Sequence, residues 1–288
     1  MYADAKISTA VLIVLLLQGL FSLALPVGAL IFWKSKYRLN FRPFLMGIAS
    51  FFIFALVGQQ ALHFVVLDLN PAVGAFFEAN PWLNALYVGL AAGFFEETAR
   101  LMMFKKTLQQ ETERENAVLY GIGHGGVECI VALGLTVFAN FFIALALNMG
   151  NMAEVMETMS PEESAGMLET VKLINDIPMD SVIFSVIERI CMFVLQLELS
   201  VLVFAAVRQN KLWLYPVSIA AHAAVELLST FYRTEVFGMW LTEVLIILYV
   251  ALLMIPVVRI YRTLDSLKPK KVDKFGRPVA KKAKELTM

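Results

Sequence analysis

The sequence is poor in charged residues and in cysteine. Charged side chains make up 17% of its 288 residues, whereas soluble domains carry about 25%. The two cysteines, Cys129 and Cys191, both lie inside apolar runs, which excludes a disulfide framework and leaves no zinc-ribbon spacing. Lys and Arg balance Asp and Glu at 24 each, and we expect no nucleic-acid partner. Function must therefore be sought in the apolar segments.

Hydrophobic residues account for 59% of the chain and fall in long runs. A membrane-spanning helix needs about 20 mostly apolar residues, and the sequence predicts an all-α, polytopic membrane helix bundle of about seven such helices. The first run is too long for a signal peptide, whose apolar region covers about 7–15 residues. The predicted spans are roughly 7–33, 41–67, 82–104, 116–147, 181–207, 212–231 and 236–261.

Charge in the connecting loops predicts the orientation of the bundle. The first and fifth loops and the C-terminal tail are basic, and the third holds Lys105, Lys106 and Arg114 among acids. The second and fourth loops are acidic, and the sixth is nearly neutral. Cytoplasmic loops carry an excess of Lys and Arg, so we expect the N-terminus outside and the C-terminus in the cytoplasm. We predict one transmembrane domain over 1–262, a catalytic core over about 82–232 and a basic cytoplasmic tail over 263–288. In the fourth loop, "SPEES" predicts a short helix with Ser160 as N-cap and Pro161 in its first position.

Five of the predicted spans carry ionisable residues that are candidates for function. Such residues are costly in a membrane and usually face the interior of a bundle or a water-filled cavity. We place His63 near the outer end of its span and expect it to be structural. We expect an ion pair or an outer gate from Glu188 and Arg189. The remaining candidates are Glu96, Glu97, Arg100, His124, Glu128, Glu198, His222 and Glu226.

Three of these residues fall at nearly the same depth. At about 1.5 Å per residue, Glu96 and His124 lie roughly 12 Å, and His222 roughly 15 Å, from the predicted cytoplasmic ends of their spans. Unrelated structural residues have no reason to agree in depth, so we predict one site in the cytoplasmic half of the membrane. Glu198 lies near the same plane, as a fourth member or as a structural partner of Arg100.

A carboxylate and an imidazole across a wet pocket are able to activate water. In this interpretation Glu96 is the general base, His124 holds the water and His222 stabilises the oxyanion. Glu97 and Arg100 tune or hold Glu96, and we expect the site to open toward the cytoplasmic side. Two other interpretations stay open. Glu and His are both zinc ligands, so Glu96, His124 and His222 would also be able to hold a zinc ion. The same polar plane would alternatively serve a transporter or an ion or proton pathway.

Three short motifs resemble a known family. "FFEETAR" (94–100), "GIGHGGVE" (121–128) and "HAAVE" (222–226), in this order, resemble the YhfC family of bacterial membrane proteins, regarded as glutamic-type intramembrane endopeptidases. That family looks related to the group of CAAX prenyl endopeptidases and bacteriocin-processing proteins. The resemblance covers about 90–265.

The resemblance implies roles for individual residues. Glu96 and Glu97 correspond to the acidic pair of the wider group and His124 to the histidine that activates water with it. His222 and Glu226 correspond to the oxyanion site. Arg100 comes one residue earlier than in the wider pattern. Glu226 replaces Asn or Asp, so it is expected to orient His222 instead.

The sequence thus predicts a multi-pass protein of the bacterial plasma membrane. It would hydrolyse a membrane-associated peptide or protein with Glu96, Glu97, Arg100, His124, His222 and Glu226. Glu128 and Glu198 are additional candidates. No cofactor is favoured, and zinc is the alternative.

Overall fold

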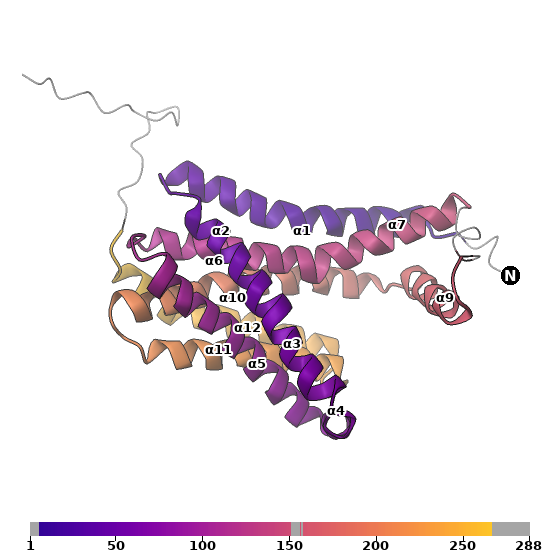
Figure 1. Ribbon diagram of the computed structural model, residues 1–288. Helices are drawn as coiled ribbons and strands as arrows, with labels where there is room; N and C mark the ends of the chain where they lie inside the picture. The colour runs from indigo at the N-terminus through magenta and orange to yellow at the C-terminus, as the bar shows by residue number, and fades with distance from the viewer. Residues whose placement is uncertain (1–5, 151–155, 157, 267–288) are drawn as a thin grey trace, which may run out of the picture.

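All regular elements of the described chain are helices. The structure, a computed structural model, describes residues 6–150, 156 and 158–266, and Figure 1 shows its helices running in one elongated bundle. The basic tail predicted for 263–288 lies almost wholly outside the described residues. Six helical segments are long and apolar enough to cross a membrane, namely Thr9–Lys36, Arg42–Asp68, Glu115–Asn148, Met179–Arg208, Leu214–Arg233 and Met239–Arg262.

The remaining predicted span, 82–104, corresponds to the helix α5, Pro81–Met102. Its 22 residues reach about 33 Å at 1.5 Å per residue, enough to cross a bilayer. It is less apolar than the other six because it carries Glu96, Glu97 and Arg100. The fold class predicted from the sequence is confirmed as an all-helical, multi-pass bundle.

The spans include short π-helical stretches. The second span joins α2 (Arg42–Ser50), η1 (Phe51–Gln59), α3 (Gln60–His63) and η2 (Phe64–Asp68). The fourth joins α6 (Glu115–Cys129), η4 (Ile130–Leu135) and α7 (Thr136–Asn148), and η3 (Met103–Thr107) continues α5. Such stretches often occur beside functional sites. The other spans are α1 (Thr9–Lys36), α10 (Met179–Arg208), α11 (Leu214–Arg233) and α12 (Met239–Arg262).

Two short helices lie between spans. The helix α4, Pro71–Glu78, begins with proline directly after Asn70, a position where the missing N–H of proline costs no hydrogen bond. The helix α9, Pro161–Asn175, begins with a capping box. Glu163 N–H donates to Ser160 Oγ at 3.3 Å, and Ser160 N–H donates to the Glu163 carboxylate at 2.8 Å. The helix predicted from "SPEES" is confirmed.

Glycine allows α6 to approach three neighbouring helices. A Cβ on Gly121 would lie 3.0 Å from Leu197 of α10, and one on Gly126 would lie 2.7 Å from Pro26 of α1. A Cβ on Gly123 would overlap the Phe44 carbonyl of α2. Small residues permit close backbone contact between membrane helices. The helix α6 is thereby held in the centre of the bundle, between α2 and α10.

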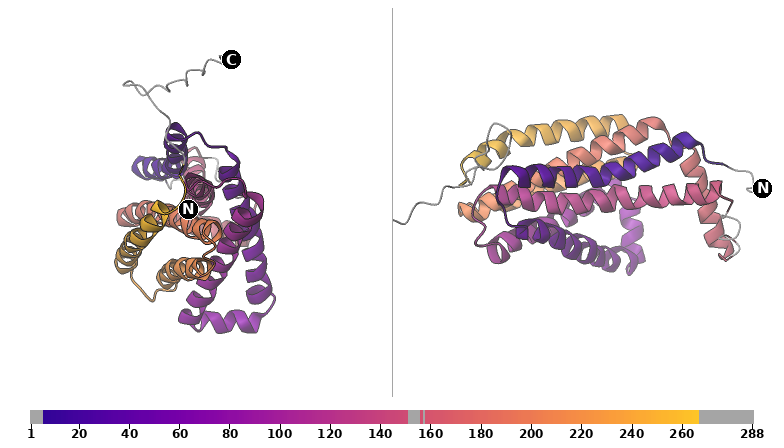
Figure 2. Two further views of the ribbon diagram at one scale, coloured as in Figure 1. Left: turned by 90° about the vertical axis from the view of Figure 1, so that its left-hand side faces the viewer. Right: turned by 90° about the horizontal axis from the view of Figure 1, so that it is seen from above.

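The helix α5 is fixed in the same way against α11, its most extensive partner. A Cβ on Gly89 would lie 2.6 Å from the Ala223 carbonyl, and one on Gly93 would lie 2.7 Å from the Ile219 carbonyl. Figure 2 shows the bundle from two further directions, with α5 and α11 side by side. These contacts bring the acidic motif of α5 and the histidine motif of α11 to the same level.

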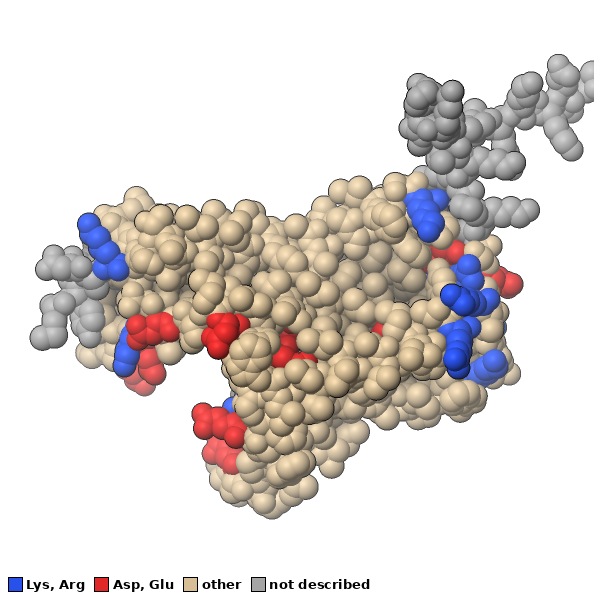
Figure 3. Space-filling model, turned by 180° about the vertical axis from the view of Figure 1, so that it is seen from behind, with Lys and Arg blue, Asp and Glu red and all other residues tan. Residues whose placement is uncertain are grey.

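Charged residues gather at the two ends of the bundle. We call the end with Lys34, Lys36, Arg208 and Arg262 the basic end, and the opposite end, with α4 and α9, the acidic end. Figure 3 shows Lys and Arg side chains concentrated at one end, and Asp and Glu along a hollow toward the other. Which end faces the cytoplasm stays a prediction from the positive-inside rule.

Candidate active site

The first element of the site is a direct contact between α5 and α6. His124 Nε2 lies 2.7 Å from Glu96 Oε2, and the two residues are only 0% and 6% exposed. The other ring nitrogen of His124, Nδ1, lies 3.2 Å from Ser50 Oγ, which also contacts the Tyr120 hydroxyl. An ionised carboxylate only accepts hydrogen bonds, so His124 donates to Glu96 from Nε2.

The second element joins α5 to α11. His222 Nδ1 lies 2.8 Å from Glu97 Oε1, and Arg100 Nη1 donates to the same oxygen. His222, Glu97 and Arg100 are all buried. The guanidinium supplies the opposite charge that a buried carboxylate requires. Glu97 therefore accepts a hydrogen bond from the Nδ1–H group of His222.

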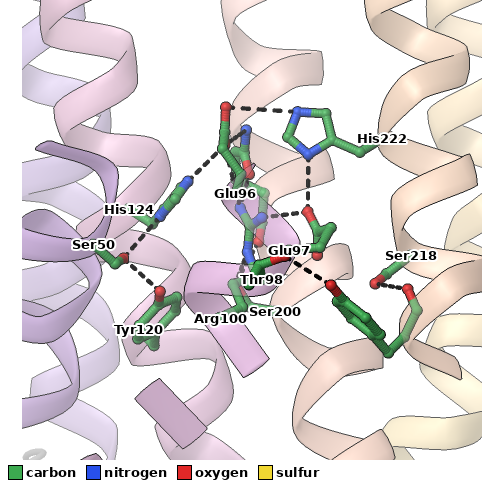
Figure 4. A network of polar contacts seen from close by, with 12 residues as sticks. Ser50, Glu96, Glu97, Thr98, Arg100, Tyr120, His124, Ser200, Ser218 and His222 are labelled. Carbon is green, nitrogen blue, oxygen red and sulfur yellow. Dashed lines mark hydrogen bonds and ion pairs between the residues drawn. The ribbon is translucent and has the colours of Figure 1, made fainter. Parts of the chain in front are cut away.

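The two elements meet at Glu96. His222 Nε2 lies 3.8 Å from Glu96 Oε1, so two imidazole rings face the two oxygens of one carboxylate. Figure 4 shows His124 and His222 on opposite sides of Glu96, with Glu97 and Arg100 below it. The common depth predicted from helix counting is confirmed for these three residues. They come from three separate spans and form one continuous polar network.

Arg100 ties α10 into this network. Its Nη2 donates to Gln196 Oε1, and its Nε donates to Ser200 Oγ at 3.3 Å. Gln196 Nε2 in turn donates to Glu96 Oε2 at 3.5 Å. Arg100 lies 3.9 Å from Glu96, farther than from Glu97, so its main partner is Glu97 at three residues' spacing rather than Glu96 at four. The guanidinium group of Arg100 thus donates to three different side chains. These bonds fix the turn of α5 that carries Glu96.

Three polar members of this network were missed by sequence reasoning. Ser50, Gln196 and Ser200 carry no charge, and uncharged polar residues in an apolar run give no strong signal. One signal was available for α10, because Gln196 and Ser200 are four residues apart and therefore share a helix face. Both are completely buried, as is Ser50.

A cavity of about 210 Å³ begins at Glu96. Its walls include Gln59 and Gln60 of the second span, Glu128 of α6, Glu188 and Arg189 of α10, and Glu226, Ser229 and Arg233 of α11. All these residues lie on the acidic-end side of Glu96. The cavity thus runs opposite to the cytoplasmic direction predicted from the sequence. The reason is packing on the other side, where Tyr120 contacts Phe104 with ring centroids 4.7 Å apart.

Glu128 and Glu226 lie on the wall of the cavity, away from the imidazoles. Glu128 Oε1 is 3.8 Å from Arg189, and Glu226 Oε2 is 3.7 Å from Arg233. In the described part of the chain no hydrogen bond joins Glu226 to His222. The orienting role expected of Glu226 is filled by Glu97 instead, because Glu97 is the residue placed against Nδ1. Arg189 also pairs with Glu188 at 2.7 Å, as predicted.

Glu198 and His63 lie outside the network. Glu198 is 2% exposed, and neither of its carboxylate oxygens has a hydrogen-bond partner among the described residues. It is not the partner of Arg100, since it projects from a different face of α10 than Gln196. His63 contacts Gln59 at 3.2 Å and the Tyr87 hydroxyl at 3.0 Å, which agrees with a structural role.

The donor set at Glu96 is chemically suited to zinc. Two imidazole Nε2 atoms face one carboxylate, and the Nδ1 atom of each ring is held by another polar group, Ser50 or Glu97. Metal-bound histidines are usually oriented through their second nitrogen in this way. As described, however, His124 contacts Glu96 directly, and the described residues contain no group of three or more His, Cys, Asp or Glu arranged around a common point for a metal ion.

Comparison with known proteins gives two matches. The sequence profile described as "YhfC intramembrane metalloprotease" matches residues 21–246. The chain is 27% identical over 227 residues to the uncharacterized membrane protein YhfC of Bacillus subtilis (strain 168), a match that covers 79% of this chain and 87% of that protein. No solved structure matches the chain.

Proposed function

Because the chain belongs to the YhfC intramembrane metalloprotease family, we propose that it hydrolyses a peptide bond of a membrane-associated peptide or protein. The observation that carries the proposal is the buried contact of Glu96 with His124, 2.7 Å apart, at the inner end of a cavity. A carboxylate and an imidazole in this relation are able to hold and deprotonate one water molecule.

In this mechanism Glu96 is the general base. Its Oε2 is occupied by His124, which leaves Oε1 to accept a proton from water. The water oxygen attacks the scissile carbonyl carbon, and the resulting tetrahedral species carries its negative charge on the former carbonyl oxygen. Glu96 then returns the proton to the leaving nitrogen, so no covalent bond to the enzyme forms. His124 keeps the carboxylate aligned, because Ser50 holds the other side of the ring.

His222 is the oxyanion-side residue. Glu97 accepts a hydrogen bond from Nδ1–H, so His222 donates from Nε2 as well only as an imidazolium. Glu96 and Glu97, when both are ionised, supply the opposite charge that offsets the cost of burying this imidazolium. A donor held in place before the reaction stabilises a developing oxyanion at little reorganisation cost. Arg100 pairs with Glu97 and fixes its carboxylate in place.

A zinc-dependent peptidase is the second candidate, favoured by the family's description and by the orientation of both rings. Glu96, His124 Nε2 and His222 Nε2 would hold the ion. Zinc would supply Lewis-acid activation of water. In that case His222 must be neutral, because a ligand nitrogen needs its lone pair. The two candidates therefore differ in the protons of both histidines, because the zinc form needs a neutral His222 and a His124 that carries its proton on Nδ1.

The transporter interpretation is less well supported. A transport path needs polar groups that continue to both faces of the membrane. On the basic-end side of His124, the rings of Tyr120, Phe104 and Phe204 pack against one another and are at most 1% exposed. This packing favours a cavity that is closed at one end over a continuous polar path.

The proposal is tested by finding and cleaving a substrate. Membrane proteomes of cells that express the wild-type chain or Glu96→Ala are compared for peptides that change in length. A substrate found in this way is then incubated with purified protein. We expect Glu96→Ala, His124→Ala and His222→Ala to abolish cleavage. Cleavage at the wild-type rate by all three variants would refute the assignment.

Metal content separates the two candidates. Purified protein is analysed for zinc by mass spectrometry, and cleavage is measured before and after chelation and after zinc is restored. The glutamic mechanism predicts substoichiometric zinc and no response to the chelator. One zinc per chain that is lost in His124→Ala, together with activity that returns on adding zinc, would establish the metal-dependent form.

A further inference from the structure

The cavity that leads to Glu96 is strongly acidic. Four carboxylates line it, from Glu96, Glu128, Glu188 and Glu226, against two guanidinium groups, from Arg189 and Arg233. With all these groups in their usual ionised forms the wall carries two more negative than positive charges. A cavity of one sign with low-dielectric walls concentrates ions of the opposite sign.

Both arginines already have carboxylate partners. Arg189 donates to Glu188 at 2.7 Å and lies 3.8 Å from Glu128, and Arg233 lies 3.7 Å from Glu226. They are therefore poorly placed to recognise an anion. The wall has more hydrogen-bond acceptors than donors, and a cationic group would donate to the excess acceptors.

Two groups in the same wall lack a hydrogen-bond partner within the described chain. They are Glu128 Oε2 and Ser229 Oγ, and each atom is buried. A buried polar group without a partner costs roughly 1–3 kcal/mol, and more when it is charged, so such groups often mark the place of a ligand. The Glu128 side chain is 12% exposed, which leaves it in contact with the cavity.

Glu128 also lies at a useful distance from the proposed chemistry. It follows His124 by four residues on α6, which places it on the same helix face and about 6 Å farther toward the acidic end. A lysine or arginine side chain reaches about that far from its own backbone. A peptide bond held at Glu96 would therefore place a neighbouring basic side chain within reach of Glu128.

We propose that Glu128, with Glu226 and Ser229, forms a subsite for a Lys or Arg side chain of the substrate, next to the scissile bond. The proposal rests on the peptidase function proposed above, because only that function makes the bound molecule a substrate. Binding of a cation in the cavity is inferred from the lining residues alone and does not depend on the peptidase function. Glu128 binds the ammonium or guanidinium group, and Ser229 accepts a further hydrogen bond from it.

The test measures binding separately from cleavage. Purified, detergent-solubilised full-length protein is titrated against a capped ten-residue peptide that carries an uncharged fluorophore and a central Lys. Matched peptides have Arg, Gln or Glu at that position, and anisotropy gives each dissociation constant. Because charge-assisted hydrogen bonds contribute roughly 1.5–3 kcal/mol, we expect Lys and Arg peptides to bind at least about tenfold tighter than the Gln peptide.

Substitutions in the wall then locate the preference. Glu128→Gln should bring the Lys and Gln peptides to within about twofold of each other, and Ser229→Ala should reduce the preference less. Glu243→Gln is the matched control, since Glu243 is a buried carboxylate of α12 outside the cavity lining. It should retain the full preference. Thermal unfolding of each variant checks that the fold is intact, and Glu226→Gln replaces Glu128→Gln if the latter unfolds.

Three binding results would overturn the subsite. They are equal binding of the Lys and Gln peptides, tightest binding of the Glu peptide, and a Lys preference that survives in both Glu128→Gln and Glu226→Gln. Cleavage of an identified substrate irrespective of basic residues near its scissile bond would also refute the subsite while leaving the peptidase function intact. A Lys preference without cleavage in any assay would count against the peptidase function and leave the cation subsite intact.

Discussion

The helices α6 and α11 carry the same pattern, His-x-x-x-Glu, and use it in parallel. His124 and His222 both face Glu96, and Glu128 and Glu226, four residues later, both line the cavity. They differ in what holds the rings, because Nδ1 of His124 meets a serine hydroxyl and Nδ1 of His222 meets a carboxylate. One sequence pattern thus gives two histidines with different proton requirements. The partner at Nδ1, supplied by another helix, decides the role.

The two helices also differ in how closely their neighbours approach. In α6 glycines surround His124, and in α11 alanines occupy the corresponding positions. The glycines lie on the α6 side because α2 and α10 both press their backbones against it. For α11 the close approach is provided by Gly89 and Gly93 of α5. The site is therefore positioned by glycine on one helix of each pair.

The largest effect is expected where the two helices share a partner. Glu96→Gln keeps the shape of the side chain but removes the base that both histidines face. General-base catalysis contributes about 10²–10⁴-fold, so kcat should fall by about 10³-fold with the fold retained. Cleavage rates of the identified substrate and thermal unfolding are measured together, with Glu243→Gln as control. A loss below about tenfold would remove Glu96 from the base role.

The next largest effect is expected on stability, when a methyl group is added to the glycine-rich helix α6. In Gly123→Ala the new Cβ would overlap the Phe44 carbonyl of α2, and backbone cannot move aside as a flexible side chain does. Overpacking of this kind costs typically 1–3 kcal/mol, and we expect about 3 kcal/mol. Gly166→Ala in α9 is the control, because a Cβ there would meet nothing within 4 Å. Unfolding in mixed detergent measures both, and equal stability would show that α2 lies farther from α6.

The difference between the two Nδ1 partners predicts unequal sensitivity. Glu97→Gln removes the ionised acceptor that sustains a protonated His222, and orienting partners of this kind contribute about 10–100-fold. We expect kcat to fall by about 100-fold with little change in KM, and Glu97→Asp to restore part of it.

Ser50→Ala is the corresponding change at His124. It removes a neutral partner, while Glu96 continues to hold the ring from Nε2, so we expect a loss of about fivefold, smaller than that of Glu97→Gln. Equal losses in the two variants would mean that both histidines have the same proton requirement.

The sequence predicted the parts of the site that depend on helix geometry alone. Depth along each span correctly joined Glu96, His124 and His222, because rise per residue is nearly constant in a helix. Rotation about each span was not predictable, because it depends on which neighbour presses closest. For that reason Glu97 was assigned to Glu96 although it holds His222, and Gln196 of α10 was missed although it meets Arg100.

The predicted direction in which the cavity opens differs from that in the structure for a related reason. Depth placed the site nearer the predicted cytoplasmic ends and suggested an opening there. The rings of Phe104, Tyr120 and Phe204 fill that side, whereas α3 to α5 diverge from the rest of the bundle toward the acidic end (Figure 1). Divergence of helices follows from packing between distant segments, which no local pattern reports.

Glu198 provides the smallest effect and tests whether depth or rotation defines membership of the site. It shares the depth of Glu96 but faces away from Gln196 and lines no part of the cavity. Glu198→Gln should therefore leave kcat and KM within about twofold of wild type. It should also leave stability equal or higher, since a buried carboxylate without a partner is unfavourable. A tenfold loss of kcat in a folded protein would instead mean that α10 is rotated about its axis and presents Glu198 to Glu96.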